Sequence, residues 1–204
     1  FDGDGRRDLV NSVPDALAST ANFLDKRGYR TGEPWGYEVK LPSGFWGASN
    51  RKDKKSISHW RNQGLTLANG SPLPSTLGSA GLLLPAGTDG PAFLVGKNFD
   101  TFYSYNASEN YALAIAHLSD LIAREDSSKT DFVTTWPTDD PGISRQQSKD
   151  IQQALLNAGY DIGEVDGIIG DNTRTAIQQY QSSHGIFPAD GRAGQKFYRA
   201  IVGN

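Results

Sequence analysis

Inward-facing side chains recur at helical spacing in two stretches of the first 124 residues. The first stretch begins after Ser12, which can cap a helix, and it ends at Gly28. Pro14 lies in its first turn, where proline is tolerated. The second spans 108–124 and has the clearer period. The inward-facing positions are Leu17, Thr20, Ala21 and Leu24 in the first, and Tyr111, Ala114, Ile115, Leu118, Leu121 and Ile122 in the second. Because each set lies on one face of a helix, we predict a helix in each stretch.

Between these helices, the pattern is that of irregular chain and short strands. Residues 29–55 are rich in Gly and Pro and contain a dense basic run at 51–55, which is typical of a solvated face, so we predict irregular structure there. A short helix is expected over 57–62, with Trp60 packed inside. The apolar runs that follow predict strands at 82–85 and 92–95 and then an extended aromatic segment with Phe99, Phe102, Tyr103 and Tyr105.

The last part of the chain repeats one short unit. Asp166-Gly167 recurs as Asp190-Gly191, and Ala176-Ile177 recurs as Ala200-Ile201, at one constant offset. Asp-Gly supplies a tight turn, because glycine readily adopts positive φ. A helix follows each turn. A unit that cannot bury its own apolar face must stack on its copy, so the two copies are expected to pack together.

A further amphipathic helix, predicted over 148–158, precedes both copies. In the first copy, Asp171 or Asn172 can cap the helix, and Gly185 ends it. The result is a predicted compact module of three helices from about residue 144 to residue 204.

Composition excludes several classes of function. A net charge of −3 and a pI near 5.6 leave no basic surface for nucleic acid or an anionic membrane. No apolar run approaches the roughly 20 residues that span a bilayer. The chain has no cysteine, and its three histidines stand singly without H-x-x-x-H spacing, so a zinc peptidase or amidase site is disfavoured. Composition leaves Ser-His-Asp catalysis open, but the chain lacks the G-x-S-x-G elbow that such hydrolases use. Because the chain also lacks methionine, we expect it to be a processed or partial piece of a longer polypeptide, in which case a missing signal peptide says nothing about export.

The first residues have the spacing of a calcium-binding loop that is entered one residue late. Asp2 and Asp4 would be alternate oxygen ligands, Gly5 the sharp turn, and Arg6 a carbonyl ligand. In the ordinary register the closing acid falls on Asn11, so Asp8 and Asp15 are the available carboxylates. The alternative is a solvated Asp-Gly turn without a metal.

The order of residues in the C-terminal module is specific to one family. It runs Gln152, Leu155, Gly159-Tyr160, Asp166-Gly167, Gly170, Thr173, Ala176-Ile177 and Gln181. Most of these residues are individually core or turn residues. Taken together, the order resembles the peptidoglycan-binding domain of bacterial cell-wall enzymes.

The rest of the chain resembles the C-terminal half of the lytic transglycosylase B family of murein enzymes. The matching stretches are 2–5 with 15–23, 96–99 with 105–114, and the linker stretch 136–141. The resemblance implies an α+β fold. Residues 1–124 would be the C-terminal part of a lysozyme-like catalytic domain, 125–143 a linker, and 144–204 the peptidoglycan-binding domain.

The resemblance also implies a reaction. Family members cut the glycan between N-acetylmuramic acid and N-acetylglucosamine without water and leave a 1,6-anhydro ring. One glutamic acid acts first as acid and then as base, whereas ordinary glycosidases use two carboxylates. In the family this glutamate lies upstream of the calcium loop, and none of Glu33, Glu38, Glu109, Glu125 and Glu164 has a matching context. The isolated chain is therefore expected to be inactive, and the chemistry requires no cofactor beyond a structural calcium.

By position, the resemblance assigns one wall of the sugar-binding groove to this chain. Tyr105 and Asn106 match the family's Tyr-Asn pair beside the cleavage point, and Tyr111 matches a tyrosine that lines the cleft. Phe23 stands where relatives often have tyrosine, so it keeps a stacking face but loses a hydroxyl. Asp15 matches the late calcium ligand.

The interpretation is thus part of a lytic transglycosylase held on peptidoglycan strands by its C-terminal module and completed by a missing N-terminal part of the same polypeptide. Its expected location is the bacterial periplasm or cell envelope, with outer-membrane anchoring through that N-terminal part as one option. One rival is a non-catalytic wall-binding protein. The other is a peptidoglycan hydrolase or amidase, which would need a metal or a second carboxylate in the missing part.

Overall fold

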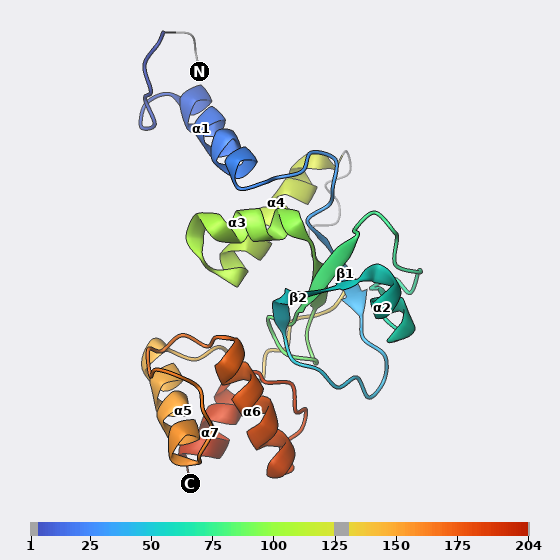
Figure 1. Cartoon of the computed structure of the whole chain (residues 1–204), viewed down its shortest axis with the longest axis vertical. Coiled ribbons are helices and arrows are strands. Elements are labelled where there is room, and N and C mark those ends of the chain that lie inside the picture. The colour runs from blue at the N-terminus through green and yellow to red at the C-terminus, as the bar shows by residue number, and fades with distance from the viewer. Residues whose placement is uncertain (1–3, 125–130, 204) are drawn as a thin grey trace. The chain divides into compact units, whose positions relative to one another are not determined.

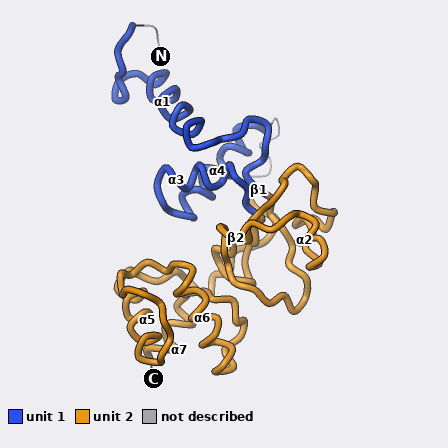
Figure 2. Tube along the Cα trace, viewed as in Figure 1, with its two compact units in different colours: residues 1–36, 95–130 blue, residues 37–94, 131–204 orange. Residues whose placement is uncertain are grey.

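The computed structural model describes residues 4–124 and 131–203. It has mixed helices and strands, which confirms the predicted α+β class (Figure 1). The chain divides into two compact units (Figure 2). Unit 1 comprises residues 1–36 and 95–130, and unit 2 comprises residues 37–94 and 131–204. This division by compactness differs from the predicted domain boundaries, which stay a prediction.

Unit 1 is built from three helices: α1 (Val13–Lys26), α3 (Lys97–Asn106) and α4 (Glu109–Ala123). The predicted helices at 12–28 and 108–124 are confirmed. Each starts at a serine whose hydroxyl accepts a backbone N–H of the first turn, Ser12 from Asp15 and Ser108 from Tyr111. The helices α3 and α4 lie side by side (Figure 1).

The predicted extended aromatic segment was wrong, because residues 97–106 form α3. The aromatic positions alone suggested a strand, but Phe99 and Phe102 stand three residues apart and are both buried on one helical face. Gly96 is the N-cap, and Ala107, with a left-handed φ of 45°, ends the helix. The helical period therefore prevailed over the strand preference of aromatic residues.

Unit 2 contains a five-stranded sheet and the small helix α2 (Ile57–Asn62), which was predicted with these bounds. The strands are β1 (Gly36–Lys40), β2 (Asn50–Ser56), β3 (Thr66–Leu67), β4 (Ser79–Leu83) and β5 (Ala92–Val95). Their order across the sheet is β2-β4-β5-β1-β3, with β2 antiparallel to β4 and β1 antiparallel to β3. The predicted strand at 92–95 is confirmed, whereas the one at 82–85 begins and ends earlier, at 79–83.

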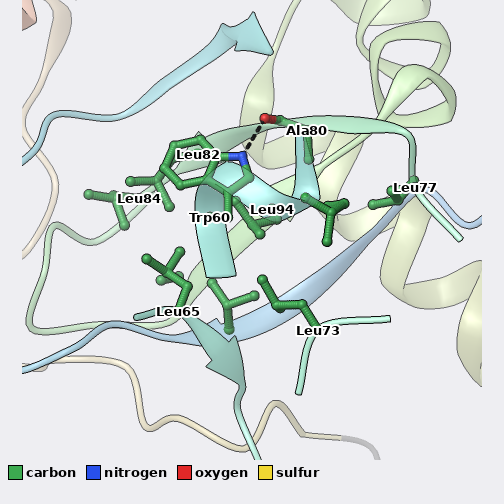
Figure 3. Packing of buried hydrophobic residues seen from close by; sticks show 11 residues of the cluster. Trp60, Leu65, Leu73, Leu77, Ala80, Leu82, Leu84 and Leu94 are labelled. Carbon is green, nitrogen blue, oxygen red and sulfur yellow. Dashed lines mark hydrogen bonds between the residues drawn. The ribbon is translucent and has the colours of Figure 1, made fainter. Parts of the chain in front are cut away.

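The core of the sheet gathers around α2 (Figure 3). Trp60 is buried there as predicted, and its indole Nε1 donates a 2.8 Å hydrogen bond to the carbonyl of Ala80. Leu65, Leu73 and Leu77 belong to the same cluster. The indole thus contributes apolar area while its one polar atom remains satisfied.

The prediction that residues 29–55 are irregular was wrong, because β1 and β2 lie within them. Strand β2 is an edge strand in which Lys52 and Lys55 are exposed and Lys54 is half-buried, while Arg51 is buried. A register shift between Asn50 and Lys55 disturbs its pairing, so no clean alternation appears in the sequence. A charged edge strand resists pairing with other chains, which accounts for its polar composition.

The C-terminal part of unit 2 is the predicted three-helix module. Its helices are α5 (Arg145–Asn157), α6 (Asp171–Ser183) and α7 (Gln195–Val202). They close over a core that includes Ile151, Leu155, Ile177 and Phe197. Helix α5 begins earlier than predicted because Ser144 and Gln147 form a capping box.

The expected cap at Asp171 or Asn172 was wrong. Gly170 is the N-cap of α6, and no side chain caps the helix. Gly194 is likewise the N-cap of α7, again without a side-chain hydrogen bond to the cap. Within residues 4–124 and 131–203, no helix combines the length and apolar character that a bilayer crossing requires.

Candidate functional site

Three of the predicted sugar-binding side chains come together in unit 1. The ring of Phe23 on α1 meets the ring of Tyr105 on α3 edge-on, with centroids 5.4 Å apart. The ring of Tyr111 on α4 is stacked with that of Tyr105 at 6.3 Å and an interplanar angle of 7°. Residues far apart in sequence therefore form one aromatic cluster.

The short connection between α3 and α4 places this pair of tyrosines. Ala107 adopts a left-handed conformation and donates its N–H to the carbonyl of Tyr103. Ser108 then caps α4 at once. Because this sharp turn reverses the chain, the last turn of α3 faces the first turn of α4, and Tyr105 meets Tyr111.

The aromatic cluster borders a cavity of about 200 Å³. Its lining is largely apolar: Thr20, Leu24, Phe102, Tyr105, Tyr111 and Ile115. Tyr105 is 52% exposed, so part of its side chain is accessible at the rim. An apolar pocket with aromatic faces and a few hydroxyls suits a sugar ring, whose C–H face packs on aromatics while its hydroxyls need polar partners.

Asn106, the fourth predicted sugar-binding residue, is the last residue of α3 and is exposed. It is not among the residues that line the cavity. Asn106 lies beside Tyr105 because the two residues are adjacent in sequence. Contact of Phe23, Tyr105, Asn106 and Tyr111 with a sugar stays a prediction.

Sequence reasoning missed a residue that organises this unit. The side chain of Asn98 is 1% exposed and accepts a 2.7 Å hydrogen bond from the backbone N–H of Arg30. Its amide nitrogen donates to the carbonyls of Arg30 at 2.9 Å and Glu33 at 2.6 Å. Asn98 therefore fixes the 30–33 loop against α3. The signal was available, because Asn98 belongs to the 96–99 stretch that supported the resemblance.

The calcium-binding prediction is only partly within the described residues, because Asp2 lies outside them. Asp4 is exposed and accepts the N–H of Arg6 at 2.8 Å. Asp15 is 2% exposed and accepts the N–H of Asp8 at 2.9 Å. Asp8 accepts N–H groups from Asn11 and Val10, and these bonds, the Asn11 backbone bond first, lower its pKa.

These donors have the chemistry of a calcium site, namely carboxylates around a glycine turn. Over residues 4–124 and 131–203, however, no three carboxylate or histidine side chains gather closely enough to hold a metal ion. Asp4, Arg6 and Asp15 as ligands stay a prediction.

The described glutamates of this chain lie outside the lining of the aromatic cavity. Glu33 pairs with Arg30 at 3.1 Å, Glu38 accepts the N–H groups of Val133 and Thr134, and Glu109 lies in the first turn of α4. Glu164 belongs to the module, and Glu125 lies outside the described residues. No carboxylate is among the described residues that line the aromatic cavity.

Comparison with family models divides the chain as follows. Residues 1–120 match the family described as transglycosylase SLT domain. Residues 144–201 match the family described as peptidoglycan binding domain. The first match covers the aromatic cluster and the sheet, and the second covers the three-helix module.

Individual relatives agree with these family matches. The chain is 34% identical over 128 residues to membrane-bound lytic murein transglycosylase B of Escherichia coli K12. The matched stretch covers 60% of this chain and 33% of that protein. It is also similar to the crystal structure of SltB3 from Pseudomonas aeruginosa in complex with NAG-anhNAM-pentapeptide, with 44% identity and a TM-score of 0.89. A second SltB3 structure, in complex with NAG-NAM-pentapeptide, gives 45% identity and the same TM-score. Each SltB3 match covers 98% of this chain and 53% of that one, so the chain spans about half of SltB3.

Proposed function

Because this chain belongs to the transglycosylase SLT domain family, we propose that it is part of a lytic transglycosylase acting on peptidoglycan. The reaction would break the bond between N-acetylmuramic acid and N-acetylglucosamine and close a 1,6-anhydro ring on the muramoyl sugar. The observation that carries the proposal is the similarity of 98% of the chain to SltB3, whose structure was solved with NAG-anhNAM-pentapeptide.

In this proposal, the chain supplies one wall of the groove. Tyr105 and Tyr111 present ring faces and hydroxyls at the cavity rim, and Phe23 supports the Tyr105 ring from the side. Asn106 offers its amide to a sugar substituent. Asn98 is a positioning residue, since it holds the 30–33 loop and α3 together.

The general acid would come from a preceding segment of the same polypeptide. It would protonate the glycosidic oxygen and then, as a base, take the proton of the muramoyl 6-hydroxyl, so one carboxyl serves both steps. Two observations support this assignment: no carboxylate lines the described cavity, and the chain spans about half of SltB3. The chain alone would therefore be inactive.

The calcium loop and the location complete the proposal. Asp2, Asp4, the carbonyl of Arg6 and Asp15 would hold a structural Ca²⁺ and so brace the start of α1. The three-helix module would hold peptidoglycan and raise the local concentration of glycan at the cleft. The envelope, with the periplasm as the compartment, is the proposed location.

The test is digestion of purified peptidoglycan by the intact protein, with mass spectrometry of the products. Anhydro-muramoyl ends are expected. Reducing ends would instead identify a hydrolase, and an absence of digestion together with retained wall binding would identify a non-catalytic protein. In parallel, the isolated chain should bind the polymer without cutting it.

A further inference from the structure

The two copies of the repeated unit form the same turn. In the first copy, Asp166 Oδ1 accepts the N–H of Ile168 at 2.8 Å, and in the second, Asp190 Oδ1 accepts the N–H of Arg192 at 3.0 Å. The glycine after each aspartate has positive φ. Its N–H is bound by a buried glutamine, Gln152 at 2.7 Å for the first copy and Gln181 at 2.9 Å for the second. The two copies therefore present equivalent groups to their surroundings.

In the second copy, the outward-facing groups are occupied by the protein's own chain. Asp190 Oδ2 accepts the backbone N–H of Thr88 at 2.9 Å. At the start of α7, Gln195 donates its N–H to the carbonyl of Pro141 at 3.2 Å, and Lys196 donates its N–H to Asp140 Oδ1 at 2.8 Å. The turn thus binds a peptide N–H through its carboxylate, while the adjacent helix start binds a peptide carbonyl and a carboxylate oxygen.

The close fit at this second copy is visible in Gly87. A Cβ atom added there would lie 2.3 Å from Asp190 Oδ2. The 87–88 turn can therefore approach Asp190 only because residue 87 is glycine. The contact is a built binding arrangement within unit 2.

In the first copy, the same groups border an open cavity of about 300 Å³. Gln152 Nε2 and the N–H of Ile168 both donate to Asp166 Oδ1, so Oδ2 is the counterpart of the oxygen that binds Thr88. Gly170 caps α6 without a side chain, so the first N–H groups of this helix, on Asp171 and Asn172, are the counterparts of those on Gln195 and Lys196. Asp166, Gly170, Asp171 and Asn172 all line the cavity.

We propose that this cavity is a binding site for a secondary amide. Asp166 Oδ2 would accept the amide N–H, as Asp190 Oδ2 does from Thr88. The N–H groups at the start of α6 would donate to the amide carbonyl, as Gln195 does to Pro141, although in the second copy these two bound groups belong to separate segments of the chain. The inference rests on the proposed function, in which the module holds peptidoglycan. That polymer offers secondary amides from two sources, the N-acetyl groups of the glycan and the peptide stems.

The charges around the cavity restrict the ligand further. Glu164, Asp166 and Asp171 carry negative charge, and Lys52 in the lining pairs with Asp171 at 3.1 Å. Outside the lining, Arg174 lies 3.8 Å from Asp171 and Arg145 donates to the carbonyl of Asp166. Asp166 Oδ2, the proposed acceptor, would itself repel an anionic group placed against it. A neutral amide, or one close to an ammonium group, is favoured.

The test measures binding of three probes to the full chain by NMR and calorimetry: an N-acetylglucosamine tetramer, a stem pentapeptide, and the disaccharide pentapeptide. The variant Asp166→Asn keeps an oxygen for Ile168 but replaces the acceptor Oδ2 with a donor. We expect this variant to raise the dissociation constant about tenfold for whichever probe binds. The matched control Asp190→Asn changes the equivalent oxygen of the occupied copy and should leave that constant unchanged.

A second pair of variants tests the helix start. Asp171→Pro removes one N–H at the first helical position, where proline is tolerated, and should also weaken binding. Asp171→Ala removes the same carboxylate but keeps the N–H, so Asp171→Pro should bind more weakly than Asp171→Ala does. Equal affinities across Asp166→Asn, Asp171→Pro and the parent chain, or NMR shifts confined to other residues, would overturn the site.

The probes also distinguish the two sources of the amide. Binding of the tetramer alone identifies N-acetyl groups, and binding of the pentapeptide alone identifies the stem. Failure of this inference is separable from failure of the proposed function. If the intact protein yields anhydro ends and the chain sediments with peptidoglycan regardless of Asp166, the cavity is excluded and the transglycosylase proposal stands.

Discussion

Arg192 Nε lies 2.7 Å from Asp140 Oδ2, in an ion pair whose side chains are only 17% and 13% exposed. The same guanidinium donates to the carbonyls of Asp140 and Pro85. One side chain therefore ties the second copy of the module to Asp140 and to the loop that follows β4. The module and most of the sheet belong to the same compact unit 2, and this contact lies within it.

Replacing Arg192 with alanine should destabilise unit 2. Because the change leaves Asp140 partly buried without its cation, we expect a loss of about 3 kcal/mol in the free energy of unfolding. Denaturant unfolding followed by circular dichroism measures it. Lys196→Ala is the matched control, since Lys196 and Asp139 are 61% and 68% exposed and such pairs contribute about 0–1 kcal/mol. Equal losses in the two variants would contradict the assigned role of Arg192.

Trp60 should be needed for both its volume and its indole N–H. Trp60→Phe removes the donor to the Ala80 carbonyl and leaves a small cavity. The free energy of unfolding should therefore fall by about 2 kcal/mol. Trp46→Phe is the control, because Trp46 is 71% exposed and its replacement should change stability little. Urea unfolding compares the stabilities of the two variants, provided that the denaturant dependence of the unfolding free energy is the same in both. A null effect at Trp60 would mean that the core around α2 repacks without it.

The sequence predicted those elements whose determining residues lie close together in the chain. Helices that start at Ser12, Ser56 and Ser108 were predicted, because cap and period lie within a few residues. The edge strand β2 was missed because its run of charged residues is typical of a solvated face and its pairing partner is distant in sequence. Helix α3 was missed because four aromatic residues favoured a strand, although Phe99 and Phe102 already had helical spacing.

The candidate site shows the same division. The resemblance named Phe23, Tyr105 and Tyr111, and the structure brings their rings together. No local pattern could show that Asn98 reaches the backbone of Arg30, or that Asp190 reaches Thr88, since both contacts join distant parts of the chain. Long-range contacts of buried polar groups emerge only from the packed structure.

The pKa of Asp166 should respond to Gln152. The hydrogen bond from the Gln152 side chain, and then that from the Ile168 backbone, lower this pKa below its ordinary value of 3.8. Because the folded value is the lower one, the associated stability is present above pH 3.8 and is lost as the pH falls through the folded pKa. NMR titration of the carboxyl carbon should show the pKa rising toward 3.8 in Gln152→Leu. In the control Gln153→Leu, on an exposed side chain that binds Asn157, the pKa should stay where it is.

Tyr105 should act mainly through its ring. If the 52% exposed ring packs against a sugar, Tyr105→Ala in the intact protein loses about 1.5 kcal/mol of apolar contact, which is about tenfold in kcat/KM. Tyr105→Phe keeps the ring, its edge contact with Phe23 and its stacking on Tyr111, so it should retain most of the activity. Release of anhydro-muropeptides from purified peptidoglycan measures both variants.

The exposed Trp46 provides the comparison, because Trp46→Ala removes a larger aromatic that lies outside the cavity lining. Its kcat/KM should match that of the parent protein. If Tyr105→Phe were as impaired as Tyr105→Ala, the hydroxyl rather than the ring face would carry the contribution. The cavity between α1, α3 and α4 would then bind its sugar through hydrogen bonds at the rim.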